Sequence, residues 1–491
     1  MNALPAAIAL LIQVPPPFQT VDLDRGESAE VSLPGGPKVR VRLIDLQEHR
    51  CDLRGAVRRA EATVEIEGER ATLPSALYNL PRPVGPVQVD CPVTRGYTAN
   101  SSKDNVWALE KDARLRLWPA DAPWIDPRTF LCPAGQRWFA SDTQMGNDPC
   151  YVDGGEVPGQ KKIYYHYGLD FGGAEGCVPV RAASDGVVVS RGTETLPGDR
   201  PPLVKPRYDV VYLLDDRGWY HRYSHLAAID PSVHVGRRLA LGDPIGVLGK
   251  EGASGGWSHL HFDVCLPQPS GKYGMTDAYA LAFESYRRRH GLTLLAVARP
   301  HRVAWAGEPV TLEGTRSWHA GGPARLRRWE WRFTDGGTAE GPVVTRTYGR
   351  PGHYTEILTV TDDEGRSAVD FAVVQVFDRE RPKPPIPTLH VAFWPTTGVR
   401  AGEEVTFKAR AFNVRPDEGR EAWVFGDGSE PVFTRSDGNA QALAKDGYAV
   451  TTHRYARPGR YIVTVTRAND LGWTATGRVW LEVGPAAGGG G

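Results

Sequence analysis

The chain has 491 residues, a formal net charge of zero and a pI of about 7.2. This length suggests three or four domains of roughly 100–200 residues, and the balanced charge argues against binding to nucleic acid or to an anionic membrane surface. Abundant Gly (55) and Pro (40) predict short strands and many turns, and therefore a mainly β, multidomain fold.

The N-terminal part predicts β structure after a short leader. Residues 1–17 contain an apolar run, Ala6 to Ile12, without a positive segment before it, which indicates an incomplete signal peptide. No run of about 18 apolar residues occurs, so no spanning helix is expected. Alternating stretches such as AEVSLPGGPKVRVRLIDL predict an antiparallel β domain of unknown role over 18–120. The irregular segment 121–160 is a connector containing two cysteines.

The cysteines bear on the compartment. An even number in a loop-rich chain favours disulfides and an exported protein, and the alternative is six buried free thiols in a cytosolic protein. No C-x-x-C occurs, which argues against a thiolate zinc site. The simplest pairing joins neighbours along the chain, namely Cys51–Cys91, Cys132–Cys150 and Cys177–Cys265.

Strand signals repeat through 161–291, in GVVVSR, DVVYLLDD, WYHRYSHL, DPIGVLG and HLHFDVCL. Between two of them, the Pro-rich insertion 193–207 is expected to be a surface loop. After the last strand, TDAYALAFESYRRRHG (276–291) predicts a helix that Thr276 or Asp277 can cap and that a glycine can terminate.

An internal repeat follows this helix. Tyr348 and Tyr354 in the first copy correspond to Tyr455 and Tyr461 in the second. These residues resemble the polycystic-kidney-disease (PKD) immunoglobulin-like module, whose hallmark WxFGDG is nearly intact as Trp423-Val424-Phe425-Gly426-Asp427-Gly428. The first copy departs from the hallmark, with Thr334 in place of Gly.

The PKD resemblance implies two β-sandwiches, over 293–378 and 387–484, that serve as spacers or bind a cell-wall or polysaccharide surface. The Pro-rich segment 379–386 between them is expected to be a stiff linker. The second copy carries about fifteen extra residues near SDGNAQALAKDGYAV (436–450), expected to form a longer loop, and 485–491 is a flexible glycine tail.

Three histidine clusters between the connector and the helix carry the chemistry. His259 and His261 in HLHF would point to one face of a strand, where burying two imidazoles without partners is costly. His166 and Asp170 are four residues apart, but the aromatics and glycines of YYHYGLDFGG favour a strand and loop over a helix. A metal ion would satisfy these groups, and nitrogen and oxygen ligands with two imidazoles suit zinc better than calcium or magnesium.

A further imidazole, His225, ends the WYHRYSHL stretch. Strand alternation would place Trp219, His221, Tyr223 and His225 on one face, so His221 is a rival to His225.

Together these motifs resemble the lysostaphin-type, or LytM-type, zinc metallopeptidases, which show H-x-x-x-D, Y-x-H-L and a Gly/Ser-rich turn ending in HLHFE. The resemblance covers about 110 residues and implies an antiparallel β peptidase domain. By position, it implies zinc ligands at His166, Asp170 and His261 and catalytic histidines at His225 and His259.

The family resemblance implies a secreted zinc endopeptidase that cuts peptidoglycan stems or cross-links, in the cell envelope or outside the cell. We assign His259 to the attacking water and His225 to the developing oxyanion, although the sequence does not distinguish these two roles. Trp257-Ser258 replaces the usual Gly-Pro, and Asp263 replaces the usual Glu. The alternatives are a non-catalytic wall-binding or regulatory protein and a secreted zinc protease acting on extracellular protein.

Overall fold

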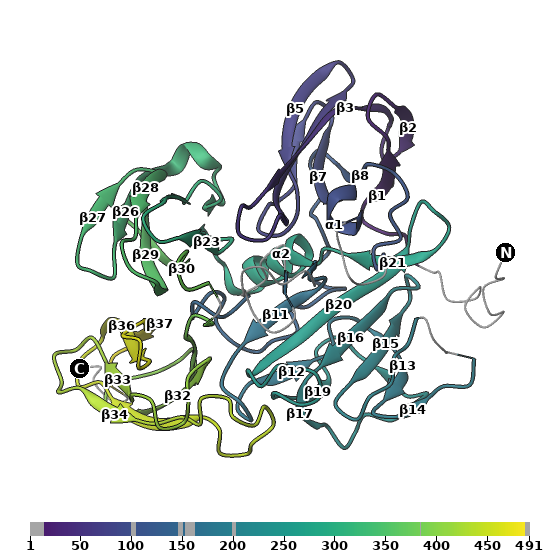
Figure 1. Cartoon of the computed structure of the whole chain (residues 1–491). Helices are drawn as coiled ribbons and strands as arrows, with labels where there is room; N and C mark the ends of the chain where they lie inside the picture. Colours follow the sequence, from purple (N-terminus) through teal and green to yellow (C-terminus); the bar gives the residue numbers. More distant parts are fainter. Residues whose placement is uncertain are drawn as a thin grey trace.

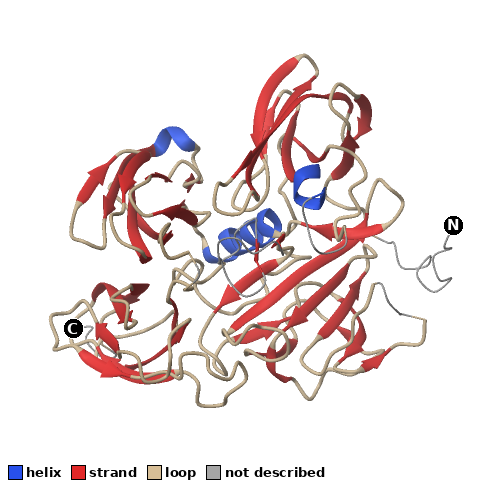
Figure 2. Ribbon diagram, in the orientation of Figure 1, coloured by secondary structure: helices blue, strands red, loops and turns tan. Residues whose placement is uncertain are grey.

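The computed structural model describes residues 14–99, 105–145, 151–152, 163–198, 203–382 and 384–486. Its elements are almost all strands in antiparallel sheets, which confirms the mainly β, multidomain fold class (Figures 1 and 2). The apolar run of the predicted leader and most of the predicted glycine tail lie outside the described residues. Within the described part, no helix has the length and apolar character needed to cross a membrane.

The N-terminal β domain consists of two four-stranded sheets, ordered β1-β8-β7-β6 and β2-β3-β4-β5. In β3 every second residue at its start is buried, as the alternation in KVRVRL predicts. Arg116 on β8 pairs with Asp90 inside this domain and also donates to the carbonyl of Asp277, so the domain is fixed to the one after it. The elements are β1 (Gln19–Leu23), β2 (Ser28–Ser32), β3 (Lys38–Arg50), β4 (Val57–Ile66), β5 (Glu69–Pro74), β6 (Arg82–Val84), β7 (Val87–Thr94), α1 (Arg95–Ala99) and β8 (Ala113–Pro119).

The central domain is built on an eight-stranded sheet with the main order β11-β20-β16-β15-β13-β14, accompanied by a three-stranded sheet β12-β19-β17. Strand β20 lies inside the large sheet and is buried along nearly its whole length. The elements are β9 (Tyr151–Val152), β10 (Ile163–Tyr164), β11 (Leu169–Gly172), β12 (Pro179–Arg181), β13 (Gly186–Arg191), β14 (Glu194–Thr195), β15 (Val211–Asp215), β16 (Tyr220–Ser224), β17 (Leu226–Ile229), β18 (Arg238–Leu239), β19 (Pro244–Leu248), β20 (His259–Pro267), β21 (Tyr273–Thr276) and α2 (Tyr279–His290).

The predicted helix forms as α2, three residues later than its predicted start, because Thr276 belongs to β21. Asp277 accepts the N–H of Tyr279 at 2.8 Å, and Gly291 ends the helix in the left-handed conformation at φ +61°.

Two sandwiches follow. Their larger sheets join in one nine-stranded sheet, because β29 of the first pairs in parallel with β37 of the second. The Pro-rich linker therefore connects two modules that lie side by side (Figure 1). The first contains β22 (Leu294–Leu295), β23 (Arg302–Trp305), β24 (Pro309–Glu313), β25 (Trp318–His319), η1 (Pro323–Arg325), β26 (Leu326–Arg332), β27 (Thr338–Glu340), β28 (Val343–Thr347), β29 (Gly352–Asp362) and β30 (Ser367–Phe377). The second contains β31 (Thr388–Trp394), β32 (Glu404–Phe412), β33 (Glu421–Val424), β34 (Val432–Thr434), β35 (Ala449–Arg454), β36 (Gly459–Ala468) and β37 (Thr474–Val483).

The connector joins the central domain to both sandwiches. The N–H of Met145 donates to the carbonyl of Asp170 on β11 at 2.8 Å. Buried Arg299, at the start of the first sandwich, donates to the carbonyl of Met145 at 2.8 Å. Trp480 of the second sandwich donates its N–H to Ala140 at 2.9 Å. The sandwiches are therefore packed on the central domain.

The predicted disulfides do not form among the described cysteines. Cys51, Cys91, Cys132, Cys177 and Cys265 are all free, and Cys150 lies outside the described residues. The pairings Cys51–Cys91 and Cys177–Cys265 are therefore wrong. Cys91 packs in the N-terminal core, whereas its expected partner Cys51 borders a different apolar cluster, so proximity in sequence gave no proximity in space.

Candidate metal centre

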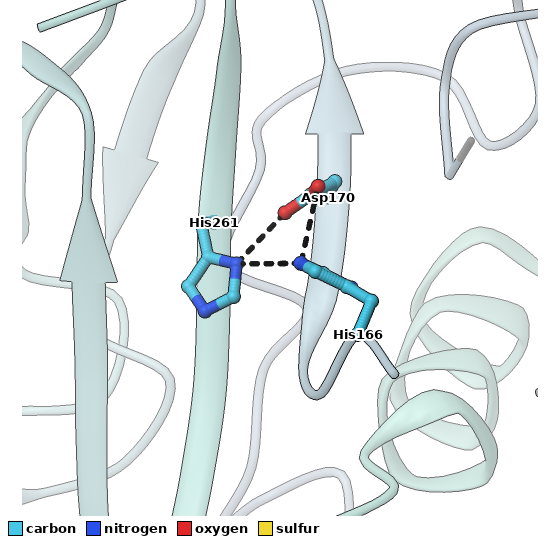
Figure 3. A group of neighbouring side chains, drawn as sticks. All are labelled: His166, Asp170 and His261. Carbon is cyan, nitrogen blue, oxygen red and sulfur yellow. Dashed lines mark hydrogen bonds and ion pairs between the residues drawn. The ribbon is translucent and has the colours of Figure 1, made fainter. Parts of the chain in front are cut away.

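Three side chains of the central domain converge where β11 and β20 pair (Figure 3). Asp170 on β11 lies opposite His261 on β20. His166 precedes β11, and the chain turns back at Gly168, where φ is +87° and a side chain would collide with the backbone of Phe262. Nε2 of His166 lies 3.1 Å from Nδ1 of His261, and the two Asp170 oxygens lie 2.9 Å from His261 Nδ1 and 3.3 Å from His166 Nε2. Asp170 thus reaches the group through a turn, as predicted.

This group has the donors and the spacing of a metal site. The ligand atoms of His166, Asp170 and His261 all lie within 4.8 Å of one another. Tetrahedral zinc holds such atoms at about 2.0–2.2 Å, which places them about 3.3–3.6 Å apart, close to the separations observed. The second nitrogen of His261, Nε2, lies 3.0 Å from Asp263, and metal-bound imidazoles commonly have such a carboxylate partner. The residues present therefore fit zinc.

The charges of the metal-free group favour a cation. Burial raises the pKa of Asp170, but the neighbouring His166 and His259 and the hydrogen bonds to the carboxylate outweigh burial and hold that pKa well below its usual value. Burial lowers the pKa of His261, while hydrogen bonds to Asp170 and Asp263 reverse this effect and raise it. A metal ion at His261 therefore competes with a proton.

Two more imidazoles lie beside the three ligand candidates. His259 begins β20, and its Nε2 lies 3.7 Å from Asp170. Its ring centroid is 4.5 Å from that of His225. Nδ1 of His259 lies 3.0 Å from the carbonyl of Trp257, and Nδ1 of His225 lies 2.7 Å from the carbonyl of Glu251. Because a carbonyl only accepts, the Trp257 contact puts the His259 proton on Nδ1 and leaves its Nε2 with a lone pair. The 2.7 Å Glu251 contact favours the same tautomer for His225 over the longer 3.2 Å contact between Nδ1 and the Arg207 guanidinium. Burial lowers the pKa of both rings and keeps them neutral.

The orientation of His225 depends on a carboxylate that no motif predicted. His225 has φ +67°, a conformation that costs a non-glycine residue about 1–3 kcal/mol. Asp209 accepts the backbone N–H of His225 at 2.9 Å and the guanidinium of Arg207 at 2.6 Å. Burial raises the pKa of Asp209, but the contacts with the His225 ring, the Arg207 guanidinium and the His225 N–H together outweigh burial and lower that pKa. Neither residue stands out in the sequence, although Arg207 ends the 193–207 insertion.

The strand face predicted to hold both His221 and His225 is broken, because β16 ends before the left-handed His225. His221 is fully buried, with Nε2 3.1 Å from Asp215 and its ring stacked on Phe262. His221 is thus a core residue, and only His225 of the two rivals lies beside the ligand candidates.

Aromatic side chains border the group. Trp257 stacks on His259, with ring centroids 3.8 Å apart and an interplanar angle of 14°. A small, partly open cavity beside His166 is also lined by Tyr97 and Trp107 of the N-terminal β domain. That domain therefore forms part of the surroundings of the candidate metal centre.

Comparison with known families identifies this arrangement. Residues 164–271, which contain all three ligand candidates and both further histidines, match the model of peptidase family M23. The central domain is an M23 peptidase domain. Residues 295–376 and 389–479 each match a PKD domain model, so the two sandwiches are PKD domains. The resemblances found in the sequence are confirmed.

Several solved structures share parts of the chain at low overall similarity. The catalytic domain of the prophage-encoded M23 protein EnpA from Enterococcus faecalis is 18% identical, with 28% of this chain and 92% of that chain covered and a TM-score of 0.19. Csd3 from Helicobacter pylori is 17% identical, with 48% and 56% covered and a TM-score of 0.19. Fibronectin(III)-like modules of Clostridium thermocellum CbhA are 17% identical, with 40% and 94% covered and a TM-score of 0.15.

Proposed function

We propose that this chain is a secreted zinc endopeptidase that hydrolyses peptide bonds in peptidoglycan stems or cross-links. The observation that carries the proposal is the convergence of His166, Asp170 and His261 inside an M23 domain. These three residues are the proposed zinc ligands. A purely wall-binding or regulatory role would not require the complete donor set, which favours the enzyme.

Zinc held by these residues would polarise the scissile carbonyl and lower the pKa of a bound water toward about 7. His259 is proposed to take the proton of the attacking water, because its free Nε2 faces the ligand group. His225 is proposed to donate from Nε2 to the developing oxyanion in its imidazolium form, with that proton taken up from solvent before the substrate is attacked. The Asp209 carboxylate, 3.5 Å from Nδ1 of His225, supplies the charge that compensates that imidazolium.

The proposed partners and location of the protein rest on its substrate class and on its accessory domains. Peptidoglycan peptides are the proposed partners, and the PKD domains are proposed to offer a cell-wall or polysaccharide-binding surface. Both support the proposal that the protein acts outside the cell or in the cell envelope. The five free cysteines give no support to that location.

Metal analysis and wall digestion test the proposal together. The purified chain should contain about one zinc ion, and His261→Ala should lose both zinc and the digestion of purified peptidoglycan. His234→Ala is the matched control, because this exposed histidine belongs to the same domain and lies outside the ligand group. Digestion by His261→Ala at the parent's rate would refute the assignment. Cleavage of protein substrates without cleavage of muropeptides would favour the extracellular protease.

A further inference from the structure

The second PKD domain makes direct contact with the glycine-rich turn that leads into β20 (Figure 1). Most of these contacts come from the segment 436–450, the extra residues that distinguish the second repeat from the first. The turn, 255–258, ends immediately before His259. Three hydrogen bonds join the domain to the turn, from Asn439 Nδ2 to the Gly255 carbonyl (3.0 Å), from Arg410 Nη1 to the Gly256 carbonyl (2.6 Å) and from the Ser258 N–H to the Tyr448 hydroxyl (2.7 Å).

Arg410 bonds both to the extra loop 436–450 and to the turn 255–258. Its guanidinium is fully buried, and all five N–H donors have acceptors. Two bonds, of 2.8 and 2.6 Å, go to the carboxylate of Asp437, and two go to the carbonyls of Gln441 and Ala442. The fifth crosses to Gly256. The side chain that folds the loop therefore also holds the turn, which indicates a built interface.

The two glycines closest to the second PKD domain have no room for a side chain. Gly256 has φ +90°, and a Cβ there would overlap the Asn439 side chain and lie 3.0 Å from the backbone of Ala442. Gly172, opposite His259 in the β11–β20 register, would place a Cβ 2.6 Å from the carbonyl oxygen of Thr143 in the connector and 3.2 Å from Nε2 of His390 on β31. The turn before β20 and the end of β11 therefore both lie against the second PKD domain.

Aromatic rings extend the contact to His259. One face of Trp257 stacks on His259 at 3.8 Å, and His390 packs edge-on against Trp257 at 5.6 Å. His390 Nδ1 lies 2.8 Å from the hydroxyl of Tyr448, the same hydroxyl that accepts the Ser258 N–H. Tyr448 thus connects the backbone of the turn with the ring that supports Trp257. Tyr448, His390 and Ser258 are all buried, so water does not readily replace these bonds.

We propose that the second PKD domain is a positioning part of the peptidase site, in which Tyr448 fixes the turn 255–258 and, through Trp257, the ring of His259. This inference rests on the proposed function and assigns to the extra loop a role in turnover. The proposed zinc ligands His166, Asp170 and His261 contact one another, and His261 also contacts Asp263, so we expect metal binding to persist when the loop is perturbed.

The test uses the full chain with Tyr448→Phe, which removes only the hydroxyl. Tyr455→Phe is the matched control, because Tyr455 is buried in the same domain and its hydroxyl donates to Phe425, away from the turn. Hydrolysis of purified muropeptide dimers gives kcat and KM. Hydrogen–deuterium exchange of the peptide that contains Ser258 reports on the turn without reference to activity.

We expect Tyr448→Phe to lower kcat by about 10- to 100-fold, because misplacing a catalytic group by about 1 Å has an effect of that size. KM should change by less than about twofold, since the variant alters His259 rather than uniform substrate binding. The Ser258 amide should exchange about fivefold faster, the factor for one net hydrogen bond. Zinc content should equal that of the parent, and Tyr455→Phe should match the parent in all four measurements. Asn439→Ala, at a half-buried loop position, should show the same pattern to a smaller degree.

Parent-like kcat and exchange in Tyr448→Phe would overturn the proposal. A rise in KM alone would also overturn it, because the loop would then bind substrate without positioning His259. If the parent cleaves no peptide, the proposed function fails on its own. The exchange difference between Tyr448→Phe and Tyr455→Phe then still decides whether the second PKD domain holds the turn.

Discussion

Asp209→Asn should displace His225 while the zinc ligands stay in place. One carboxylate oxygen of Asp209 accepts the His225 N–H and Nη2 of Arg207, and the other accepts Nε of Arg207. Asparagine offers one oxygen and one NH₂ group, so in either orientation at least one donor of Arg207 or His225 faces another donor.

The expected magnitude follows from these contacts. Losing a charge-assisted hydrogen bond at a buried carboxylate costs about 1.5–3 kcal/mol. The Arg207 side chain is 27% exposed and recovers part of this loss from water, which leaves roughly 1–2 kcal/mol. The left-handed backbone of His225 costs a comparable amount, about 1–3 kcal/mol. His225 should therefore leave its position in a large share of molecules, and kcat should fall about 10- to 100-fold.

The assay compares kcat on muropeptide dimers and zinc content for the parent, Asp209→Asn and Asp230→Asn. The control makes the same change where the carboxylate accepts the N–H of Ser232 in a turn. Parent-like turnover by Asp209→Asn would refute its role in orienting His225. Loss of zinc from that variant would refute the independence of the ligand group from His225.

Three further perturbations test separate parts of the structure. Asp263→Ala should weaken zinc binding about 10- to 100-fold in a chelator competition, because His261 loses its carboxylate partner, and unchanged affinity would contradict this. Gly255→Ala should destabilise the chain by about 1–2 kcal/mol through its left-handed backbone alone. Gly256→Ala should destabilise it more, because its Cβ would also collide with the second PKD domain. Equal shifts of the two variants in thermal unfolding would argue against that contact. Burial raises the pKa of Asp142 to about 7, although hydrogen bonds from the Arg478 N–H and the Thr355 hydroxyl lower it in part. Because the pKa of Asp142 is higher in the folded than in the unfolded state, its protonated form contributes to the free energy of unfolding in full below about pH 4. That contribution is lost as pH rises toward about 7, so the free energy of unfolding from urea denaturation should fall by a few kcal/mol over this range. Asp142→Asn should lack this dependence on pH.

Much of the fold follows from local pattern. Period-2 alternation identified the strands of the N-terminal domain, and Trp423 and Phe425 of the PKD hallmark are core residues of the second sandwich. The parallel pairing of Gly352 with Thr474, which joins the two PKD domains, carries no side-chain signal because it uses only backbone groups. The expected Cys51–Cys91 disulfide failed for a related reason: Cys91 lies in the N-terminal core and Cys51 borders a different cluster, and only the tertiary fold determines that.

The ligand candidates were predictable because short-range geometry places them. His261 and His259 share a strand face by alternation, and Asp170 returns toward His166 through a local turn. His225 was harder to place. Alternation assumed that β16 continues, whereas a carboxylate at Asp209 holds His225 out of the strand through a tertiary contact. The sequence therefore predicted which residues gather but not what orients them.

Both segments that the sequence marks as additions contact the glycine-rich stretch 252–258, which includes the turn 255–258. Arg207, at the end of the 193–207 insertion, lies so close to Gly252 that a Cβ there would be 2.5 Å from its Nε. The extra loop of the second PKD domain also lies close to Gly256, where a Cβ would overlap the Asn439 side chain. Both loops therefore restrict the backbone beside the proposed catalytic histidines. Each constrains one side of the turn, the first next to His225 and the second next to His259. The two proposed catalytic imidazoles are therefore oriented by parts of the chain outside the histidine motifs, which explains why those motifs alone do not specify how the site is arranged.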